Sequence, residues 1–278
     1  MTVGLLILAF VAYQLWGTGI WANRSQNDLT RQFDQAREAY LGTPPPGDGT
    51  APAPPIPAEG QAGGVVKIPK IGVDWVFVEG VTRDDLKKGP GHYPETPYPG
   101  TLGNAAIAGH RTTYGAPFYE INELEPGDRI IVETAAGTFT YAMTEQLIVR
   151  PDQVEVVANT PDAELTLTSC HPRYSAAQRI VVKAKLVPDE SAQPAPPPPR
   201  PTVAADAPTA LDEALGGDPA SRGPAIAWGL AAAAVGGLWW WAFRRWRHPL
   251  TWIAGFIPFT IPLFFFYVYL ERLLPAGY

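Results

Sequence analysis

Two proline- and glycine-rich stretches limit where this chain can build a folded core. Residues 42–64 read GTPPPGDGTAPAPPIPAEGQAGG, and residues 188–223 include QPAPPPPRP. A segment of this composition has too few large apolar side chains to bury, so both stretches are predicted to be extended spacers. Between them, residues 65–187 are the only stretch that can form a soluble domain.

This central stretch has the pattern of a β-domain. Short runs rich in Val, Ile and Thr follow one another, and clusters of Gly, Pro or Asn separate them, which is typical of β-strands. The runs are VVKIPKIGV, WVFVEGV, GNAAIAGHR, DRIIVET, TFTYAMTEQLIV, ELTLTSC and RIVVKAKLV. Two short helical pieces are expected at TRDDLKKG and PFYEINEL. Seven or more short strands in a domain of this size predict a mainly β protein with a closed barrel of about eight strands.

Three apolar runs outside this domain predict membrane spans. Residues 3–21, VGLLILAFVAYQLWGTGIW, carry no charge and as a helix would cover roughly 28 Å, enough to cross a bilayer. No basic residue precedes this run, which favours an uncleaved anchor over a signal peptide. Residues 225–243 and 250–270 are also long enough to span a membrane.

The predicted organisation therefore has five parts. Residues 1–23 form an N-terminal anchor, and residues 24–64 hold a polar juxtamembrane helix and the first spacer. The soluble domain covers 65–187, the second spacer 188–223, and a transmembrane helical hairpin 224–278. The short connection RRWRH at 244–248 is strongly basic. The positive-inside rule places it in the cytoplasm and the soluble domain on the outer side of the membrane.

Composition excludes several classes of function. The net charge of −6 argues against a general nucleic-acid role. One cysteine, Cys170, excludes an internal disulfide and any metal site built from several cysteines. A lone thiol in an exported domain is exposed to oxidation, so Cys170 is a candidate for chemistry.

The position of Cys170 suggests which residues accompany it. Cys170 ends one predicted strand, and Arg179 begins the next after the loop HPRYSAAQ. The end of one strand faces the start of the other in a hairpin, so these side chains are expected to be neighbours. A guanidinium there would favour a thiolate and stabilise an oxyanion. His110 closes the run GNAAIAGHR and is the candidate proton carrier.

These motifs resemble the sortase signature. The sequence TLTSC, an arginine nine positions after the cysteine, and GHR upstream are similar to membrane-anchored cysteine transpeptidases of Gram-positive bacteria. The stretch GPGHYPETPYPGTLGNAAIAGHRTTYGAPF resembles the class E sortases of actinobacteria. The resemblance covers about residues 65–187 and implies a sortase-like β-barrel. It implies Cys170 as nucleophile, His110 as general acid/base and Arg179 as the oxyanion and substrate clamp.

The resemblance also implies the reaction and further site residues. A C-terminal sorting signal of Leu-Ala-x-Thr-Gly type, carried by a secreted protein, is cleaved between Thr and Gly. A cell-wall amine, from a peptidoglycan precursor or stem peptide, resolves the thioacyl enzyme, and neither a metal nor an organic cofactor is needed. Tyr114 in HRTTYG is expected to line the pocket for the second signal position. Thr168 and Ser169 precede the nucleophile as further substrate-binding candidates, and Ser169 stands where the family usually has threonine.

Two other functions remain open. A pilin-polymerising sortase would use a lysine of another pilin as its amine. Such enzymes often carry an N-terminal lid with an Asp-Pro-aromatic motif, which residues 42–64 lack. A non-catalytic membrane-bound scaffold would use the barrel for binding only, and the joint presence of Cys170, His110 and Arg179 argues against it. In each case the protein is expected in the cell membrane, with residues 65–187 facing the wall.

Overall fold

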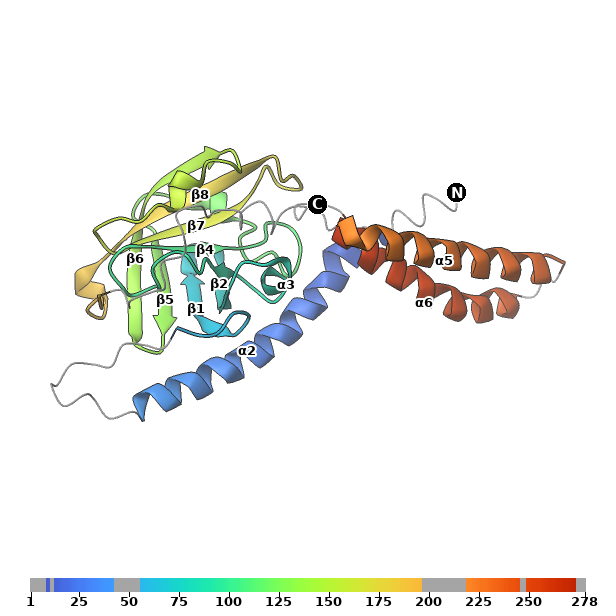
Figure 1. The fold of residues 1–278 in the computed structure, drawn as a ribbon, viewed down its shortest axis with the longest axis horizontal. Coiled ribbons are helices and arrows are strands. Elements are labelled where there is room, and N and C mark those ends of the chain that lie inside the picture. Colours follow the sequence, from blue (N-terminus) through green and yellow to red (C-terminus); the bar gives the residue numbers. More distant parts are fainter. Residues whose placement is uncertain (1–8, 11–12, 43–55, 197–218, 246–248, 274–278) are drawn as a thin grey trace. The chain divides into compact units, whose positions relative to one another are not determined.

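A computed structural model describes residues 9–10, 13–42, 56–196, 219–245 and 249–273. Two compact units make up the chain, one over residues 1–215 and one over residues 216–276. The first unit holds the β-domain and the helix that precedes it (Figure 1).

The first unit contains a closed barrel with the strand order β1-β2-β3-β4-β7-β8-β6-β5 (Figure 1). This confirms the predicted mainly β fold with a closed barrel of about eight strands. The strands are β1 Ala62–Ile68, β2 Val73–Glu79, β3 Gly91–His92, β4 Asn104–Ala108, β5 Arg129–Thr134, β6 Gly137–Val149, β7 Glu164–His171 and β8 Gln178–Leu186. β1 begins before the predicted boundary at residue 65, and β3 lies outside the predicted runs.

Large side chains from several strands fill the barrel interior. The alternating burial along β5, for example, shows one face of that strand packed inward. The loop before β4 also reaches this core, because the Gly100 N–H donates to the Tyr141 hydroxyl at 3.1 Å. Gly100 has a φ of 87°, and a Cβ there would lie 2.2 Å from the Phe139 ring. The largest fully buried side chains include Phe77, Ile107, Phe118, Phe139, Tyr141, Leu165, Leu167 and Ile180.

The two predicted helical pieces are both present and short. α3, Arg83–Leu86, begins after Thr82, whose hydroxyl accepts the Asp85 N–H at 3.3 Å. The second piece contains only a 3₁₀ helix, Ile121–Glu123. Further 3₁₀ helices are Pro69–Ile71, Val154–Val157, Pro188–Glu190 and Pro219–Ser221.

A long helix precedes the barrel and packs against its outer surface. A π-helix, Tyr13–Gly17, leads directly into α2, Thr18–Leu41. Figure 1 shows α2 running past β1 and β2. Leu29 and Phe33 are buried in a cluster with Ala62, Val76 and Val78 from these strands. Residues three and four apart share one face of a helix, so this face of α2 is its barrel-facing side.

A single glutamine on the same face joins α2 to the edge of β2. The Gln26 Nε2 donates to the carbonyls of Val76 at 2.9 Å and Lys88 at 3.0 Å, and the Val76 N–H donates to Gln26 Oε1 at 2.8 Å. β3 pairs with β2 only at Val78 and Glu79, so on this side of β2 Val76 has no strand neighbour. The Gln26 amide makes the hydrogen bonds that a neighbouring strand would make there. A Cβ on Gly89 would lie 2.5 Å from the Gln26 amide nitrogen, so glycine makes room for it.

We expect Gln26→Leu to weaken the docking of α2, because the Val76 backbone groups lose their side-chain partners. The cost should be about 1–3 kcal/mol of unfolding free energy, with faster hydrogen exchange at the Val76 amide. Gln32→Leu is the matched control, since the buried Gln32 Oε1 has no hydrogen-bond partner among the described residues. Equal effects of the two substitutions on Val76 exchange would contradict this assignment.

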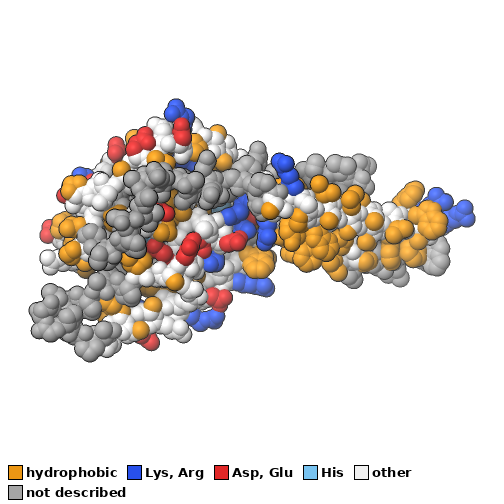
Figure 2. All heavy atoms as spheres, in the orientation of Figure 1, with side chains coloured by type: hydrophobic (Ala, Val, Ile, Leu, Met, Phe, Trp, Pro, Cys, Tyr) orange, Lys and Arg blue, Asp and Glu red, His pale blue; other side chains and the backbone are white. Residues whose placement is uncertain are grey.

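The second unit is a helical hairpin of α5, Arg222–Phe243, and α6, Pro249–Leu273. The Trp228 and Phe265 rings stack with centroids 4.7 Å apart, and Gly229 allows Phe266 to approach. Pro258 and Pro262 lie inside α6. Figure 2 shows hydrophobic side chains covering the visible face of both helices. Among the described residues, α5 is the helix that is long and apolar enough to cross a membrane.

Candidate active site

Two strand pairings place the predicted residues around one end of the barrel. β7 pairs antiparallel with β8, and in this register Cys170 lies opposite Arg179. β7 also pairs in parallel with β4, and Thr168 lies opposite Ala108. β4 stops there, and the next residues, Gly109 and His110, continue beside the end of β7.

Main-chain and side-chain hydrogen bonds fix the segment that carries His110. The Gly109 N–H donates to the Thr168 carbonyl at 3.0 Å, and the Ser169 hydroxyl donates to the Gly109 carbonyl at 2.8 Å. The predicted substrate-binding hydroxyl of Ser169 is therefore bound to the residue before His110. The Thr168 hydroxyl lies 3.1 Å from the Tyr93 hydroxyl. Both hydroxyls hold the walls of the site together.

Five of the six predicted site residues line one pocket. Its walls are formed by Val81, Leu86, Tyr93, Ala108, Gly109, His110, Thr168, Ser169, Cys170 and Arg179. Tyr114 does not line the pocket; its ring packs against the His110 ring with centroids 5.1 Å apart. The structure thus brings the candidate nucleophile, proton carrier and cation together, with Tyr114 behind the imidazole.

Two polar atoms in this pocket are buried without a hydrogen-bond partner among the described residues. They are His110 Nε2 and Arg179 Nε. His110 is 7% exposed and Arg179 is 4% exposed. The Arg179 Nη1 is engaged, since it donates to the carbonyls of Ala176 and Gln178 at 2.8 Å each. An unsatisfied buried polar atom is costly, so two of them beside a thiol indicate a place for polar groups of a ligand.

Burial sets the resting charges of the pocket. It raises the pKa of the Cys170 thiol above its ordinary value, although the Arg179 and Arg111 guanidinium groups partly offset this. Burial, together with the smaller effects of the Arg83 and Lys87 charges, lowers the pKa of His110 to about 4. At neutral pH the site therefore rests as a thiol beside a neutral imidazole, which can accept the thiol proton.

Arg111 is a neighbour of Cys170 that the sequence analysis did not identify. Its Nη1 donates to the Cys170 carbonyl at 3.2 Å, its Nε to the Tyr119 carbonyl at 2.7 Å, and its Nη2 to Asn122 Oδ1 at 2.6 Å. The guanidinium is almost fully buried. Arg111 thus joins the end of β7 to the segment after His110. Its position next to His110 in GHR was the available signal.

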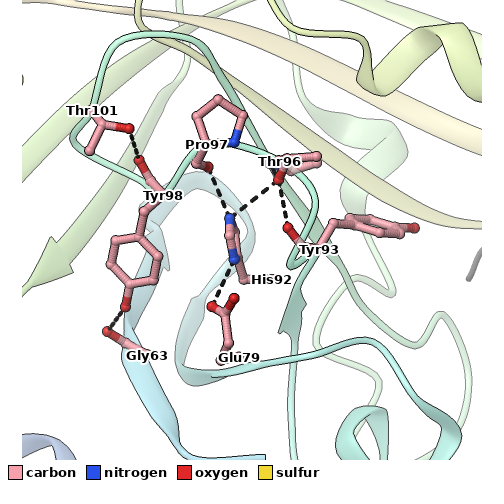
Figure 3. A network of polar contacts seen from close by, with 9 residues as sticks. Gly63, Glu79, His92, Tyr93, Thr96, Pro97, Tyr98 and Thr101 are labelled. Atoms are coloured by element: carbon pink, nitrogen blue, oxygen red, sulfur yellow. Dashed lines mark hydrogen bonds and ion pairs between the residues drawn. The ribbon is translucent and has the colours of Figure 1, made fainter. Parts of the chain in front are cut away.

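A buried polar network surrounds His92, the residue before the pocket-lining Tyr93 (Figure 3). His92 Nδ1 is 2.8 Å from Glu79 Oε2, and His92 Nε2 is 2.9 Å from the Pro97 carbonyl. The buried imidazole thus lies between a carboxylate and a backbone carbonyl. The Thr96 hydroxyl donates to the Tyr93 carbonyl at 2.9 Å and accepts the Ala106 N–H at 3.1 Å. This network fixes the turn that supplies Tyr93.

Comparison with known proteins identifies the family. The model of the sortase domain matches residues 66–187. Sortase SrtE2 of Streptomyces coelicolor is 30% identical over 209 residues, which cover 67% of this chain and 79% of that protein. The chain belongs to the sortase family.

Other relatives agree with this assignment. Sortase SrtE1 of Streptomyces coelicolor is 35% identical over 67% of this chain and 55% of its own length. Sortase D of Bacillus subtilis is 38% identical over 47% of this chain and 67% of its own length. The two Streptomyces proteins support the class E resemblance, and the chain spans little more than half the length of SrtE1.

We expect His92→Leu to destabilise the barrel by about 3–5 kcal/mol, because the buried Glu79 carboxylate loses its partner. The double substitution Glu79→Leu/His92→Leu should recover part of this loss. Thermal unfolding of the full chain in detergent measures both. His171→Leu is the control, since the Nδ1 of His171 has no partner among the described residues. A double variant less stable than His92→Leu would contradict the pairing.

The raised thiol pKa predicts how Cys170 reacts with iodoacetamide. Alkylation should accelerate about tenfold per pH unit and continue to rise above pH 8.5, where an ordinary thiol is half ionised. Arg179→Gln should move the profile to higher pH, because it removes a charge that favours the thiolate. Arg173→Gln serves as the control. A plateau below pH 8 would show a thiolate in the resting site instead.

Proposed function

We propose that this sortase is a membrane-anchored cysteine transpeptidase that cleaves a C-terminal sorting signal between Thr and Gly. It then joins the cleaved protein to a cell-wall amine. The observation that carries this proposal is the pocket that Cys170 lines together with His110 and Arg179, each of which has a buried nitrogen without a hydrogen-bond partner among the described residues. The chain spans 55% of the length of its relative SrtE1. The substrates and the amine acceptor of the present protein are therefore proposed together with the reaction.

The first step uses the neutral resting pair. The His110 imidazole takes the proton of the Cys170 thiol as the sulfur attacks the Thr carbonyl carbon. The carbonyl oxygen gains the negative charge and accepts a hydrogen bond from Arg179 Nε. The imidazolium then gives its proton to the glycine nitrogen as the Thr–Gly bond breaks. A thioester on Cys170 and a free amine on the glycine fragment result.

The second step reverses the roles around the same atoms. A primary amine of the peptidoglycan precursor or stem peptide attacks the thioester carbonyl, and His110 accepts the proton that this amine releases. Arg179 again faces the oxyanion. The C–S bond then breaks, and the proton held by His110 returns to the sulfur of Cys170. A new amide bond joins the protein to the cell wall, and the resting thiol and imidazole are restored.

The walls of the pocket support a peptide with small or aliphatic side chains. Val81, Leu86 and Ala108 provide apolar surface beside Cys170. We assign Tyr114 to the choice between Ala and Pro at the second signal position, through its contact with the His110 ring. Thr168 and Ser169 would act on the substrate through the walls that their hydroxyls stabilise.

The domain would face the cell wall. The N-terminal run at 3–21 leaves the cytoplasm, and the hairpin of α5 and α6 re-enters and exits the membrane. The basic connection at 244–248 would then be cytoplasmic. Residues 3–8, 11–12 and 246–248 lie outside the described part of the chain, so the support for this arrangement is the sequence pattern and the apolar helix α5.

The test is transfer of sorting-signal peptides to an amine acceptor by the full chain in detergent. Wild-type protein should join Leu-Ala-x-Thr peptides to the amine faster than Leu-Pro-x-Thr peptides, as mass spectrometry would show. Cys170→Ala should abolish transfer because the domain has no other thiol. Arg179→Lys should be severely impaired, since an ammonium lacks the planar donors of a guanidinium.

Two outcomes would overturn the proposal. Transfer by Cys170→Ala would end the thioester mechanism. No modification of Cys170 by an electrophilic sorting-signal peptide, in a folded wild-type protein, would favour the binding scaffold. Arg173→Lys is the matched control for Arg179→Lys, because Arg173 lies on the loop just before β8 with its guanidinium over the Tyr119 ring.

A further inference from the structure

The N-terminal helix reaches the loop that carries His110. The Tyr114 N–H donates to the Thr18 hydroxyl at 3.2 Å, and this hydroxyl donates to the Gln14 carbonyl at 2.6 Å. Thr18 is 1% exposed. The contact joins the first residue of α2 to a segment almost a hundred residues later in the chain.

The loop needs an external support at this point. Tyr114 and Ala116 both have left-handed backbone conformations, with φ of 51° and 48°, which side chains rarely adopt. Tyr114 packs on the His110 ring, and the Thr113 hydroxyl lies 3.4 Å from His110 Nδ1. The Thr18 hydroxyl satisfies the buried Tyr114 amide in this strained arrangement. A change at Thr18 is therefore transmitted to His110 through two adjacent contacts.

The same helix contacts both ends of the barrel. Thr18 lies at the start of its barrel-facing side, and Phe33 and Ala36 lie farther along. Phe33 and Ala36 line a pocket together with Ala135 of the β5–β6 turn. Thr18 and Ala36 are separated by roughly 27 Å of helix. The end of the barrel with Cys170 and His110 is thus beside the start of α2, and the β5–β6 turn is beside its later half.

Thr18 belongs to the apolar run that is expected to cross the membrane. That run ends at Trp21, and Ile20 and Trp21 are 57% and 58% exposed on α2. Exposed Ile and Trp at the end of a span fit the membrane interface. Since the π-helix and α2 are continuous, the helix that leaves the membrane also contacts the catalytic loop.

We propose that α2 turns the active-site end of the barrel toward the outer surface of the bilayer, and that Thr18 is a positioning residue that holds the His110 loop there. This inference rests on the membrane anchoring in the proposed function. The substrates suited to such a site are those tethered at the membrane surface. A soluble signal peptide reaches the site without that advantage.

The orientation is tested without catalysis, in full-length Cys170→Ala protein in lipid nanodiscs. A fluorophore is attached to Thr112→Cys in the His110 loop or to Thr138→Cys after the β5–β6 turn. A nitroxide quencher on lipid headgroups should quench the Thr112 label at least severalfold more than the Thr138 label. Equal quenching, or stronger quenching at residue 138, overturns the orientation.

The positioning role is tested with variants at Thr18. Thr18→Val keeps the shape but removes the acceptor, so kcat for a soluble peptide should fall about tenfold, the equivalent of one hydrogen bond. KM should change little because the pocket walls remain. Thr18→Ser should restore kcat. Thr30→Val is the matched control, because the Thr30 hydroxyl makes the same kind of intrahelical bond, to the Gln26 carbonyl, at an exposed position.

Hydrogen exchange separates failure of this inference from failure of the proposed function. In wild-type protein the Tyr114 amide should be protected, and Thr18→Val should remove that protection. If the wild type transfers peptide but its Tyr114 amide exchanges hydrogen as fast as an unprotected loop amide, the positioning role is wrong. A kcat for Thr18→Val equal to wild type also overturns it. If the wild type transfers no peptide, the proposed function fails, while the exchange result still decides the contact.

Discussion

The double pairing of β7 is the constraint on which the site depends. On one side β7 runs antiparallel to β8, which sets Cys170 opposite Arg179. On the other it runs parallel to β4, which brings His110 to the same end of the barrel. Side chains alternate along a strand, so a shift of one residue in either pairing would turn one partner away from the pocket. The hairpin that carries Cys170 and Arg179 meets the distant segment that carries His110 because one strand holds both neighbours in register.

The residues that could be predicted are those whose relationship is local in sequence. Cys170 and Arg179 belong to one hairpin, and their proximity follows from strand pairing alone. His110 was a candidate because it closes a predicted strand, but its place beside Cys170 depends on a parallel pairing between distant strands, which no local pattern reveals. β3 was not predicted, because two residues, Gly91 and His92, carry no alternation.

The packing of helix α2 on the barrel could not be predicted from the sequence for a different reason. Its barrel-facing positions include Thr18, Ala22, Gln26, Leu29 and Phe33, spaced three or four residues apart. Only two of these are large apolar residues, so the segment resembled a polar juxtamembrane helix. Its attachment depends partly on hydrogen bonds in which the backbone N–H groups of Val76 and Tyr114 donate to side chains of α2. Apolar periodicity cannot detect a surface of that kind.

Because the site is buried, a neutral Cys170 thiol and a neutral His110 imidazole are the stable starting groups for the proposed transfer. A buried thiol and imidazole avoid the cost of holding two separated charges out of water. In the proposed mechanism the charges form only when a carbonyl enters. Its oxygen then accepts from Arg179 Nε, which has no partner among the described residues, and the thiol proton moves to His110. The same apolar walls limit the access of water to the thioester. An amine that binds beside Cys170 can therefore compete with water, which is far more concentrated, so burial favours transfer over hydrolysis.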